Sequence, residues 1–171
     1  MFQQSMLTTP IGPLLAVMSA DGLCGLEFDV PERATRLWAR LARFRPGLAT
    51  RPGDRAAFGA IAAWLDAYFS GRWDACAAPV ALDLAGTPFE LDVWNELMRL
   101  TPGTTTSYGA IATALGRRDA ARAVGAAVGA NPVSLVVPCH RVVGASGSLT
   151  GYGGGLDRKE WLLKHEGALL L

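Results

Sequence analysis

Residues 107–130 have the sequence SYGAIATALGRRDAARAVGAAVGA, which predicts two short helices joined by a tight turn. Ser107 can cap the first helix, and Gly116 ends it. Asp119 can cap the second helix, which should span residues 120–130. Two short helices with such a connection are typical of a helix-turn-helix.

A further helix is predicted just upstream. Thr87 can act as its N-cap, Pro88 occupies the first helical position and Glu90 completes a capping box. Residues 101–103, Thr-Pro-Gly, end this helix after one apolar face formed by Val93, Trp94, Leu97 and Leu100. The second half of the chain should therefore be mainly helical.

The first third of the chain predicts a small antiparallel sheet. Apolar stretches at residues 12–19 and 23–28 flank Asp21-Gly22, a hairpin turn signal. Two core-packing helices follow, the second with Asp54 as its candidate cap, from the apolar sets Leu37, Trp38, Leu41, Phe44 and Phe58, Ile61, Leu65, Phe69. A base-stacking platform is conceivable, but we expect core packing, for the aromatic residues Trp64, Tyr68, Phe69 and Trp73.

Residues 75–86 are the best linker candidate, with Pro79 and a short predicted strand at residues 80–84. We expect an α+β protein, in which a small N-terminal antiparallel sheet with helices precedes a mainly helical domain with a helix-turn-helix. The predicted domains are an N-terminal α/β domain, residues 1–82, and a C-terminal helix-turn-helix and active-site domain, residues 83–171. Residues 1–82 suggest no chemistry.

Composition favours a soluble globular protein. Half of the 171 residues are apolar, which is enough for a sizeable core. No apolar stretch approaches the ~18 residues of a membrane helix, and residues 1–5 lack the charged start of a signal peptide. We therefore expect a cytoplasmic protein that does not contact membranes. Three cysteines cannot all pair, and a reducing compartment suits a reactive thiol, so we expect no disulfide. Two histidines and three scattered cysteines lack the spacing of a zinc site, and we expect no metal or cofactor.

The distribution of charge is more informative than the formal net charge of +1. Between residues 117 and 164 three negative side chains face seven positive ones, which are Arg117, Arg118, Arg122, Arg141, Arg158, Lys159 and Lys164. Such a local basic patch can contact phosphates in a protein that is not basic overall. The alternative is that these residues, above all Arg158, Lys159 and Lys164, lie on ordinary solvated helix faces.

Cys139 is the strongest candidate for a nucleophile. Residues 134–137, Ser-Leu-Val-Val, predict a buried strand that Pro138 ends, so that Cys139 would lie at the edge of an element and could face a pocket. His140 follows it directly. Free cysteine often serves as a small buried hydrophobe, and this inert role is expected for the other two cysteines, Cys24 and Cys76.

Four motifs surround this cysteine: Asn131-Pro132, Pro138-Cys139-His140-Arg141, Gly151-Tyr152-Gly153-Gly154-Gly155 and Leu162-Leu163-Lys164-His165-Glu166-Gly167. Together they resemble the O6-alkylguanine-DNA alkyltransferases, the single-use proteins that repair alkylated guanine. Tyr108 and Arg122 also occur in the order that this family shows. The resemblance is dense from about Thr87 to the C-terminus and looser before it. Some family members carry a zinc ion in the N-terminal half, but nothing in this sequence supports one.

The resemblance implies a reaction at Cys139. The alkyl group on O6 of guanine in DNA, and on O4 of alkylated thymine, would move to the thiol and inactivate the protein irreversibly. An unperturbed thiol is only a few per cent thiolate at neutral pH, so its attack needs help. His140 would take the thiol proton through a water, and Glu166 would orient and stabilise the imidazolium. Asn131 would fix the active-site turn, or cap the preceding helix.

The resemblance also implies which residues hold the base. Tyr108 would donate its hydroxyl to the purine edge. The remaining substrate-binding residues would be Val137 and Pro138, with backbone N–H groups of Tyr152, Gly153 and Gly154. Gly153 stands where family members often have serine or alanine, so a backbone contact can survive there but a side-chain contact cannot.

The helix predicted at residues 120–130 carries one charged side chain, Arg122, among small residues. It lacks the long polar residues that normally read the major groove. The resemblance implies that a monomer inserts this helix into the minor groove of double-stranded DNA without sequence preference. Arg122 would fill the gap left by the extruded nucleotide. The DNA-binding residues so implied are Arg118, Ala120, Ala121, Arg122, Ala123, Ala126, Ala127 and Gly129.

Other interpretations use the same residues. The small side chains could serve close packing between helices, and Arg122 could contact a phosphate. A cysteine-histidine-glutamate hydrolase or acyltransferase would use Cys139, His140 and Glu166 as well, but it would have no need of a minor-groove helix. A helix-turn-helix regulator would explain residues 101–131 and leave the three reactive side chains idle.

Overall fold

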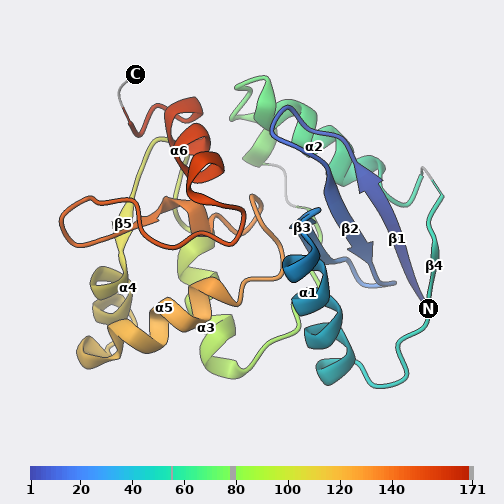
Figure 1. Cartoon of the computed structure of the whole chain (residues 1–171), viewed down its shortest axis with the longest axis horizontal. Coiled ribbons are helices and arrows are strands. Elements are labelled where there is room, and N and C mark those ends of the chain that lie inside the picture. Colours follow the sequence, from blue (N-terminus) through green and yellow to red (C-terminus); the bar gives the residue numbers. More distant parts are fainter. Residues whose placement is uncertain (55, 78–79, 170–171) are drawn as a thin grey trace. The chain divides into compact units, whose positions relative to one another are not determined.

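The computed structural model describes residues 1–54, 56–77 and 80–169, which form two compact units, Met1–Ala85 and Gly86–Leu171 (Figure 1). The first unit contains a four-stranded sheet with helices and the second is mainly helical, so the predicted α+β class is confirmed. The assignment of two domains with a boundary after residue 82 stays a prediction.

The first unit consists of β1 (Phe2–Leu7), β2 (Leu14–Met18), β3 (Leu23–Phe28), α1 (Pro31–Phe44), β4 (Thr50–Pro52), α2 (Gly59–Phe69) and the 3₁₀ helix η1 (Ala75–Ala77). The strand order is β3-β2-β1-β4. The predicted hairpin at Asp21-Gly22 is confirmed, because β2 and β3 pair antiparallel. The sheet is not wholly antiparallel, however. β4 pairs parallel to β1, since the chain reaches it only after crossing over through α1.

Two other local predictions for this unit need correction, and one strand was missed. Asp54 accepts a hydrogen bond from the backbone of Ala57 at 2.8 Å, but α2 begins at Gly59 and has no side-chain cap. The strand predicted at residues 80–84 is reduced to a single bridge between Leu82 and Leu23. Strand β1 was not predicted at all, because its sequence FQQSML lacks a long apolar run. The prediction for Pro79 lies outside the described residues.

The core of the first unit forms where α1 packs against the sheet. Its buried side chains include Val17, Cys24, Leu37 and Leu41. Tyr68 of α2 is a core residue, as expected: it is fully buried, and its ring lies 5.3 Å from Trp64, 5.2 Å from Phe69 and 5.4 Å from Trp73, which are half-buried.

The second unit consists of α3 (Pro88–Met98), β5 (Thr106–Ser107), α4 (Tyr108–Ala114), η2 (Arg118–Ala120), α5 (Ala121–Gly129), η3 (Cys139–Arg141), β6 (Val142–Val143) and α6 (Leu156–His165). The capping box at Thr87 is confirmed, with Glu90 Oε2 accepting from the Thr87 amide at 2.8 Å and Thr87 Oγ1 accepting from the Glu90 amide at 3.3 Å. Trp94 fixes α3 against α5, because its Nε1 donates to Ala127 O at 2.9 Å.

The helix-turn-helix is formed by α4 and α5. Ser107 caps α4 by accepting from the Ala110 amide at 3.1 Å, and Gly116 ends it with a φ of 69° that favours glycine. The prediction that Asp119 caps the next helix is wrong. Asp119 lies within η2, a single 3₁₀ turn that precedes α5, and the cap position falls on Ala120, whose side chain cannot accept a hydrogen bond.

Candidate active site

The segment before the cysteine is a turn, not the predicted strand at residues 134–137. The Val137 amide donates to Val133 O at 3.0 Å, and Leu135 adopts a left-handed φ of 71°. Asn131 closes this turn from inside: its Nδ2 donates to Val137 O at 2.8 Å and its Oδ1 accepts from the Val133 amide at 3.0 Å. Asn131 is 2% exposed, so its amide is a fixed part of the fold. These bonds replace the sheet partners that a strand would have needed.

Cys139 begins η3 directly after this turn. Its amide donates to Val137 O at 2.8 Å, and the residue is 7% exposed. Cys139 and His140 are therefore neighbours on a 3₁₀ helix. Neighbouring side chains point apart, because a 3₁₀ helix has about three residues per turn.

The other two cysteines are placed differently. Cys24 is fully buried in β3, with its Sγ 3.3 Å from Val17 O. Burial, together with the charge of Asp83, raises the pKa of the Cys24 thiol to about 12. Cys76 is partly buried, and its Sγ lies 3.8 Å from Trp64 O. At neutral pH the Cys24 thiol stays protonated, which suits the inert core role expected of it.

Three side chains form a buried charged cluster behind the cysteine. Glu166, the C-cap residue of α6, places its Oε1 2.7 Å from His140 Nε2. Its Oε2 accepts from Arg141 Nε at 2.9 Å, and its Oε1 also accepts from Arg141 Nη2 at 2.9 Å. Arg141 is anchored in turn by donating to Leu100 O, just after the end of α3. The carboxylate is thus held from two sides.

The protonation states of this cluster follow from its burial and pairing. Burial alone would raise the pKa of the Glu166 carboxyl, but the hydrogen bonds from His140 and Arg141 lower it to about 2. Glu166 is therefore ionised at neutral pH. Burial lowers the pKa of His140, against the opposite effect of Glu166. His140 is therefore a neutral imidazole at pH 7, whose Nε2 donates to Glu166 and whose Nδ1 carries the lone pair.

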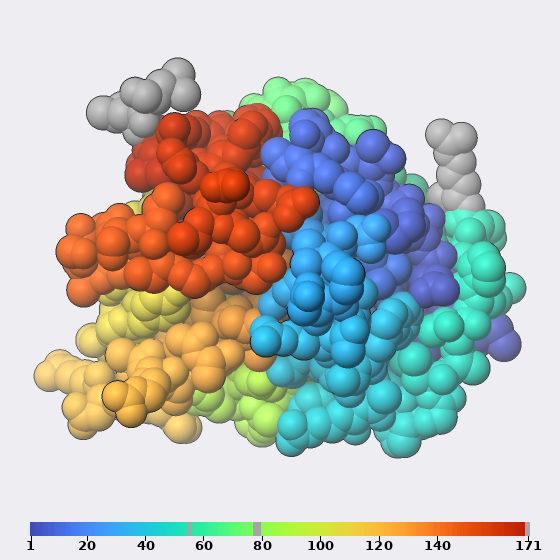
Figure 2. Space-filling view, in the orientation of Figure 1, coloured from blue at the N-terminus to red at the C-terminus, as the bar shows by residue number. Residues whose placement is uncertain are grey.

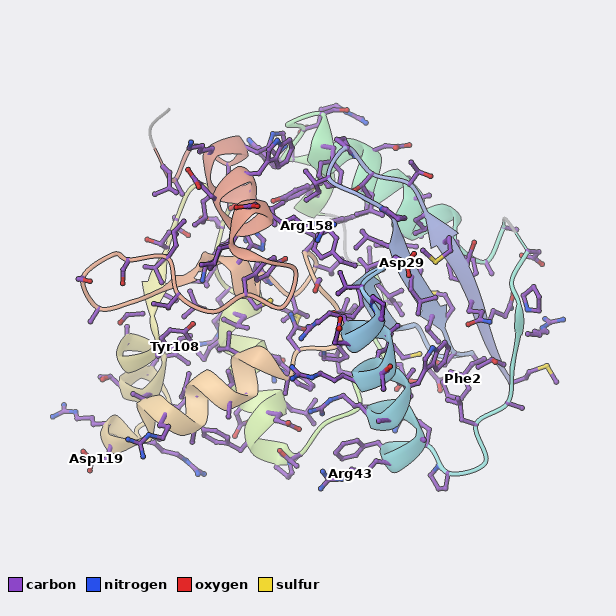
Figure 3. The ribbon with its side chains drawn as sticks, in the orientation of Figure 1. Phe2, Asp29, Arg43, Tyr108, Asp119 and Arg158 are labelled. Carbon is purple, nitrogen blue, oxygen red and sulfur yellow. The ribbon has the colours of Figure 1, made fainter. Side chains whose placement is uncertain are left out.

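The short β5–β6 pair connects the helix-turn-helix to this cluster. β6 follows η3 directly, and its Val143 pairs with Ser107, the residue before Tyr108. Tyr108 therefore begins α4 beside the strand that leaves the nucleophile (Figure 3). A side chain added at Gly125 of α5 would lie 3.7 Å from the Tyr108 ring, so that ring also lies against α5.

The loop of residues 144–155 follows β6 and contains the other predicted base-binding residues. The Tyr152 ring packs edge-on to His140, with 6.5 Å between ring centroids. Gly154 is buried and Gly153 is exposed. Arg158 of α6 holds the loop by donating from Nη1 to Gly154 O at 2.8 Å. Val137 and Pro138, on the other side of the nucleophile, are both buried.

Helix α5 presents a face of small residues. Ala123, Ala126 and Gly129 are exposed together with Arg122, and Arg118 is exposed on η2. Ala120 and Ala121 are half-buried. Figure 2 shows that α4, α5 and the loop of residues 144–155 all contribute to the visible face of this unit. The inclusion of Ala127 among DNA-binding residues is corrected here: it is 3% exposed, and its side chain faces the core with Val124 and Val128.

The basic patch predicted between residues 117 and 164 is smaller than its sequence suggests. Arg141 is 5% exposed and paired with Glu166, and Lys159 is fully buried. Neither can contact a phosphate on the surface or lie on a solvated helix face. The exposed arginines that remain are those of the helix-turn-helix, Arg117, Arg118 and Arg122, of which Arg117 lies 5.2 Å above the Phe89 ring.

Sequence reasoning therefore missed the parts that Arg141 and Lys159 play in the cluster. The signal for Lys159 was its spacing, since Leu162 and Leu163 follow it by three and four residues on the apolar face of α6. Among residues 1–54, 56–77 and 80–169, no group of three or more His, Cys, Asp or Glu side chains could hold a metal ion. In the same ranges no helix is both long and apolar enough to cross a membrane.

Comparison with known proteins agrees with this geometry. Residues 88–168 match the 6-O-methylguanine DNA methyltransferase DNA binding domain, and residues 4–84 match the ribonuclease-like domain of the same proteins. The chain belongs to the O6-methylguanine-DNA methyltransferase family. The hydrolase and regulator interpretations receive no support from these matches.

Individual family members are similar over nearly the whole chain. The methylated-DNA--protein-cysteine methyltransferase of Salmonella typhimurium is 44% identical over 170 residues, which cover 96% of this chain and 95% of that protein. The crystal structure of Mycobacterium tuberculosis OGT in complex with DNA matches with a TM-score of 0.78 and 39% identity, covering 98% of this chain and 92% of that one. The O6-methylguanine-DNA methyltransferase of Pyrococcus kodakaraensis matches with a TM-score of 0.69, 26% identity and coverage of 98% and 99%.

Proposed function

We propose that this protein repairs double-stranded DNA by moving the alkyl group from O6 of guanine, and from O4 of thymine, to Cys139. The observation that carries the proposal is the cluster around the cysteine: the adjacent His140 is neutral, buried and hydrogen-bonded at 2.7 Å to the ionised Glu166. A neutral imidazole fixed by a carboxylate is suited to accept a thiol proton. Family membership supports the same reaction.

In the proposed mechanism His140 accepts the Cys139 proton at Nδ1 through a bridging water. The thiolate attacks the alkyl carbon in line, the S–C bond forms, and the C–O6 bond breaks with its electron pair left on the purine oxygen. Glu166 stabilises the imidazolium, and Arg141 keeps the carboxylate ionised and oriented. Breaking the new S–C bond would have to expel the Cys139 thiolate, a poor leaving group, so the protein is consumed. Asn131 serves as a positioning residue, because it holds the turn that presents the thiol.

The base would be held on both sides of the nucleophile. We assign the hydroxyl of Tyr108 to the departing purine edge, where it offers a proton to the developing negative charge. The turn and the loop of residues 144–155 complete the pocket, through Val137, Pro138, Tyr152, Gly153 and Gly154. At Gly153 the contact is a backbone one, since glycine has no side chain to offer.

We propose that a monomer approaches DNA with the exposed face of α5, in the minor groove and without sequence preference. Small side chains permit close approach there, and the groove offers little base code to read. The contacts are assigned to Arg118, Ala120, Ala121, Ala123, Ala126 and Gly129, with Arg122 filling the gap of the extruded nucleotide. A reducing compartment, the cytoplasm, is the expected location because the reaction needs a free thiol.

The replacement of Cys139 by serine tests the assignment of the nucleophile. In Cys139→Ser alkyl transfer should be lost, because a hydroxyl is far less acidic than a thiol, while binding to duplex DNA stays within about twofold, since α5 is a separate element. Transfer is measured by intact mass after incubation with an O6-methylguanine duplex, and binding by fluorescence anisotropy. Cys76→Ser is the matched control and should transfer normally. Dealkylation that persists in Cys139→Ser would refute the proposal.

A further inference from the structure

Lys159 is a fully buried ammonium on the face of α6 that packs against η3. Its Nζ donates to Val142 O at 2.5 Å and to Thr150 O at 2.7 Å. Val142 is the residue after η3, and its own amide donates to Cys139 O. One ammonium thus holds the peptide next to the cysteine turn and the loop that follows it.

Burying a charge without a partner is expensive, so the ammonium needs an explanation. In the part of the chain that the structure describes, Lys159 forms no ion pair, and both contacts of its Nζ are neutral carbonyl groups. The nearby carboxylate of Glu166 is already held by His140 and Arg141. An uncharged donor could form hydrogen bonds to these two carbonyl groups equally well. The positive charge therefore points to an anion that is present during only part of the protein's working cycle.

Lys159 Nζ contacts Val142 O and the Val142 amide donates to Cys139 O, so the geometry points to the thiolate of Cys139 as that anion. Burial lowers the pKa of Lys159, while the charge of an ionised Cys139 raises it. The other charged or titratable side chains around η3 are His140, Arg141 and Glu166, with Tyr152 beside His140. Lys159 also lowers the pKa of His140, which keeps the imidazole neutral before the thiol proton arrives.

We propose that Lys159 is a positioning residue that supplies the counter-charge for the thiolate of Cys139. It transfers no proton and touches no substrate atom. The proton still passes from Cys139 to His140, and the ammonium stabilises the negative sulfur that remains. This inference rests on the proposed role of Cys139 as nucleophile, but it concerns the thiolate itself and can be tested without alkylated DNA.

The test compares how fast iodoacetamide alkylates Cys139 at pH 5 to 10 in the wild type, Lys159→Met and Lys159→Arg, with the site read by peptide mapping. In Lys159→Met the pH of half-maximal rate should rise by about one unit or more, making alkylation roughly tenfold slower below that pH. Lys159→Arg keeps the charge, so its profile should stay close to the wild-type position. Arg158→Met is the matched control, because it removes another cation that holds the same loop, and its profile should stay at the wild-type position.

Two outcomes overturn the proposal. One is an unshifted profile in Lys159→Met, and the other is an equal shift in Arg158→Met, which would assign the effect to a loosened loop. If Lys159→Met does not fold, a titration of the wild-type protein tests the proposal instead. The Lys159 side chain, titrated by NMR, should have a lower pKa after Cys139 is capped as a neutral thioether, and an unchanged titration would contradict the inference. If Lys159→Met shows the iodoacetamide shift but the wild type accepts no alkyl group from DNA, the proposed function alone is contradicted.

Discussion

At the scale of single residues, the site depends on a carboxylate with two different partners. Glu166 binds the neutral imidazole of His140 and the permanent cation of Arg141. The first contact fixes which imidazole nitrogen can accept a proton, and the second keeps the carboxylate charged inside the unit. Removing the charge should therefore weaken the fold and the reaction together.

Glu166→Gln should destabilise the protein at pH 7 by about 3 kcal/mol, because the folded pKa of about 2 lies below the ordinary value of 4.5. The folded carboxyl binds its proton less tightly than the unfolded one, so this contribution is complete above about pH 4.5 and disappears as the pH falls toward 2. Urea unfolding at pH 7, 5 and 3.5 measures it, and the difference between variant and wild type should shrink with acid.

The matched control is Glu160→Gln, which removes an exposed carboxylate that pairs with Lys164 on the same helix. Its effect should stay within about 0.5 kcal/mol at every pH, as for most surface ion pairs. A similar loss in both variants, or a difference that grows with acid, would contradict the assignment of Glu166. Alkyl transfer by Glu166→Gln should also be slower, since the imidazolium loses its stabilising charge.

The sequence identified Cys139, His140, Asn131 and Glu166 as candidates because each belongs to a recognisable motif. The contacts within the site could not be predicted from the sequence. That Arg141 reaches Glu166 across 25 positions, and that Lys159 points inward, depends on how α6 packs against η3. Charged residues are usually assigned to the surface, and only packing shows that these two are exceptions.

At the scale of elements, the sequence predicted best what is determined locally. The capping box at Thr87 and the Ser107 cap involve residues three positions apart, so the starts of α3 and α4 were foreseeable. The segment at residues 134–137 was misassigned because its apolar run also fits a buried turn. The turn forms because the Asn131 side chain hydrogen-bonds to Val137 O and to the Val133 amide, and because Leu135 adopts a left-handed φ.

Helix α5 provides the sharpest test at this scale, through Arg122→Ala. Loss of a residue that stabilises the extruded nucleotide should slow repair of an intact duplex strongly, because unstacking costs a few kcal/mol, and should affect the free base O6-methylguanine little. The measurement is the single-turnover rate on both substrates, with DNA at a saturating concentration so that a difference in affinity does not affect the rate.

Arg118→Ala is the matched control for that experiment, because Arg118 is exposed on η2 at the start of the same motif. Loss of a phosphate contact at Arg118 should weaken binding to all DNA alike and should reduce the slope of log K against log salt concentration by about one. At saturating DNA its repair rate should equal that of the wild type. If Arg122→Ala behaves in the same way, or slows both substrates equally, Arg122 is a phosphate contact as well.

At the scale of the whole molecule, every residue assigned to the site lies in the second unit, Gly86–Leu171. The formal net charge is only +1, so the protein cannot rely on overall attraction to DNA. Three exposed arginines, Arg117, Arg118 and Arg122, lie together on the helix-turn-helix instead. This arrangement fits a binder of modest general affinity whose selectivity comes from extruding a damaged base.

The central claim, that the protein is consumed by accepting one alkyl group on Cys139, is tested most directly by stoichiometry. Wild-type protein is incubated with an increasing excess of O6-methylguanine duplex, and intact mass with peptide mapping follows the modification. The account predicts that methylation stops at one group per chain, located on Cys139, however large the excess. Continued release of repaired DNA by unmodified protein would contradict it, as would a methyl group found on Cys24 or Cys76.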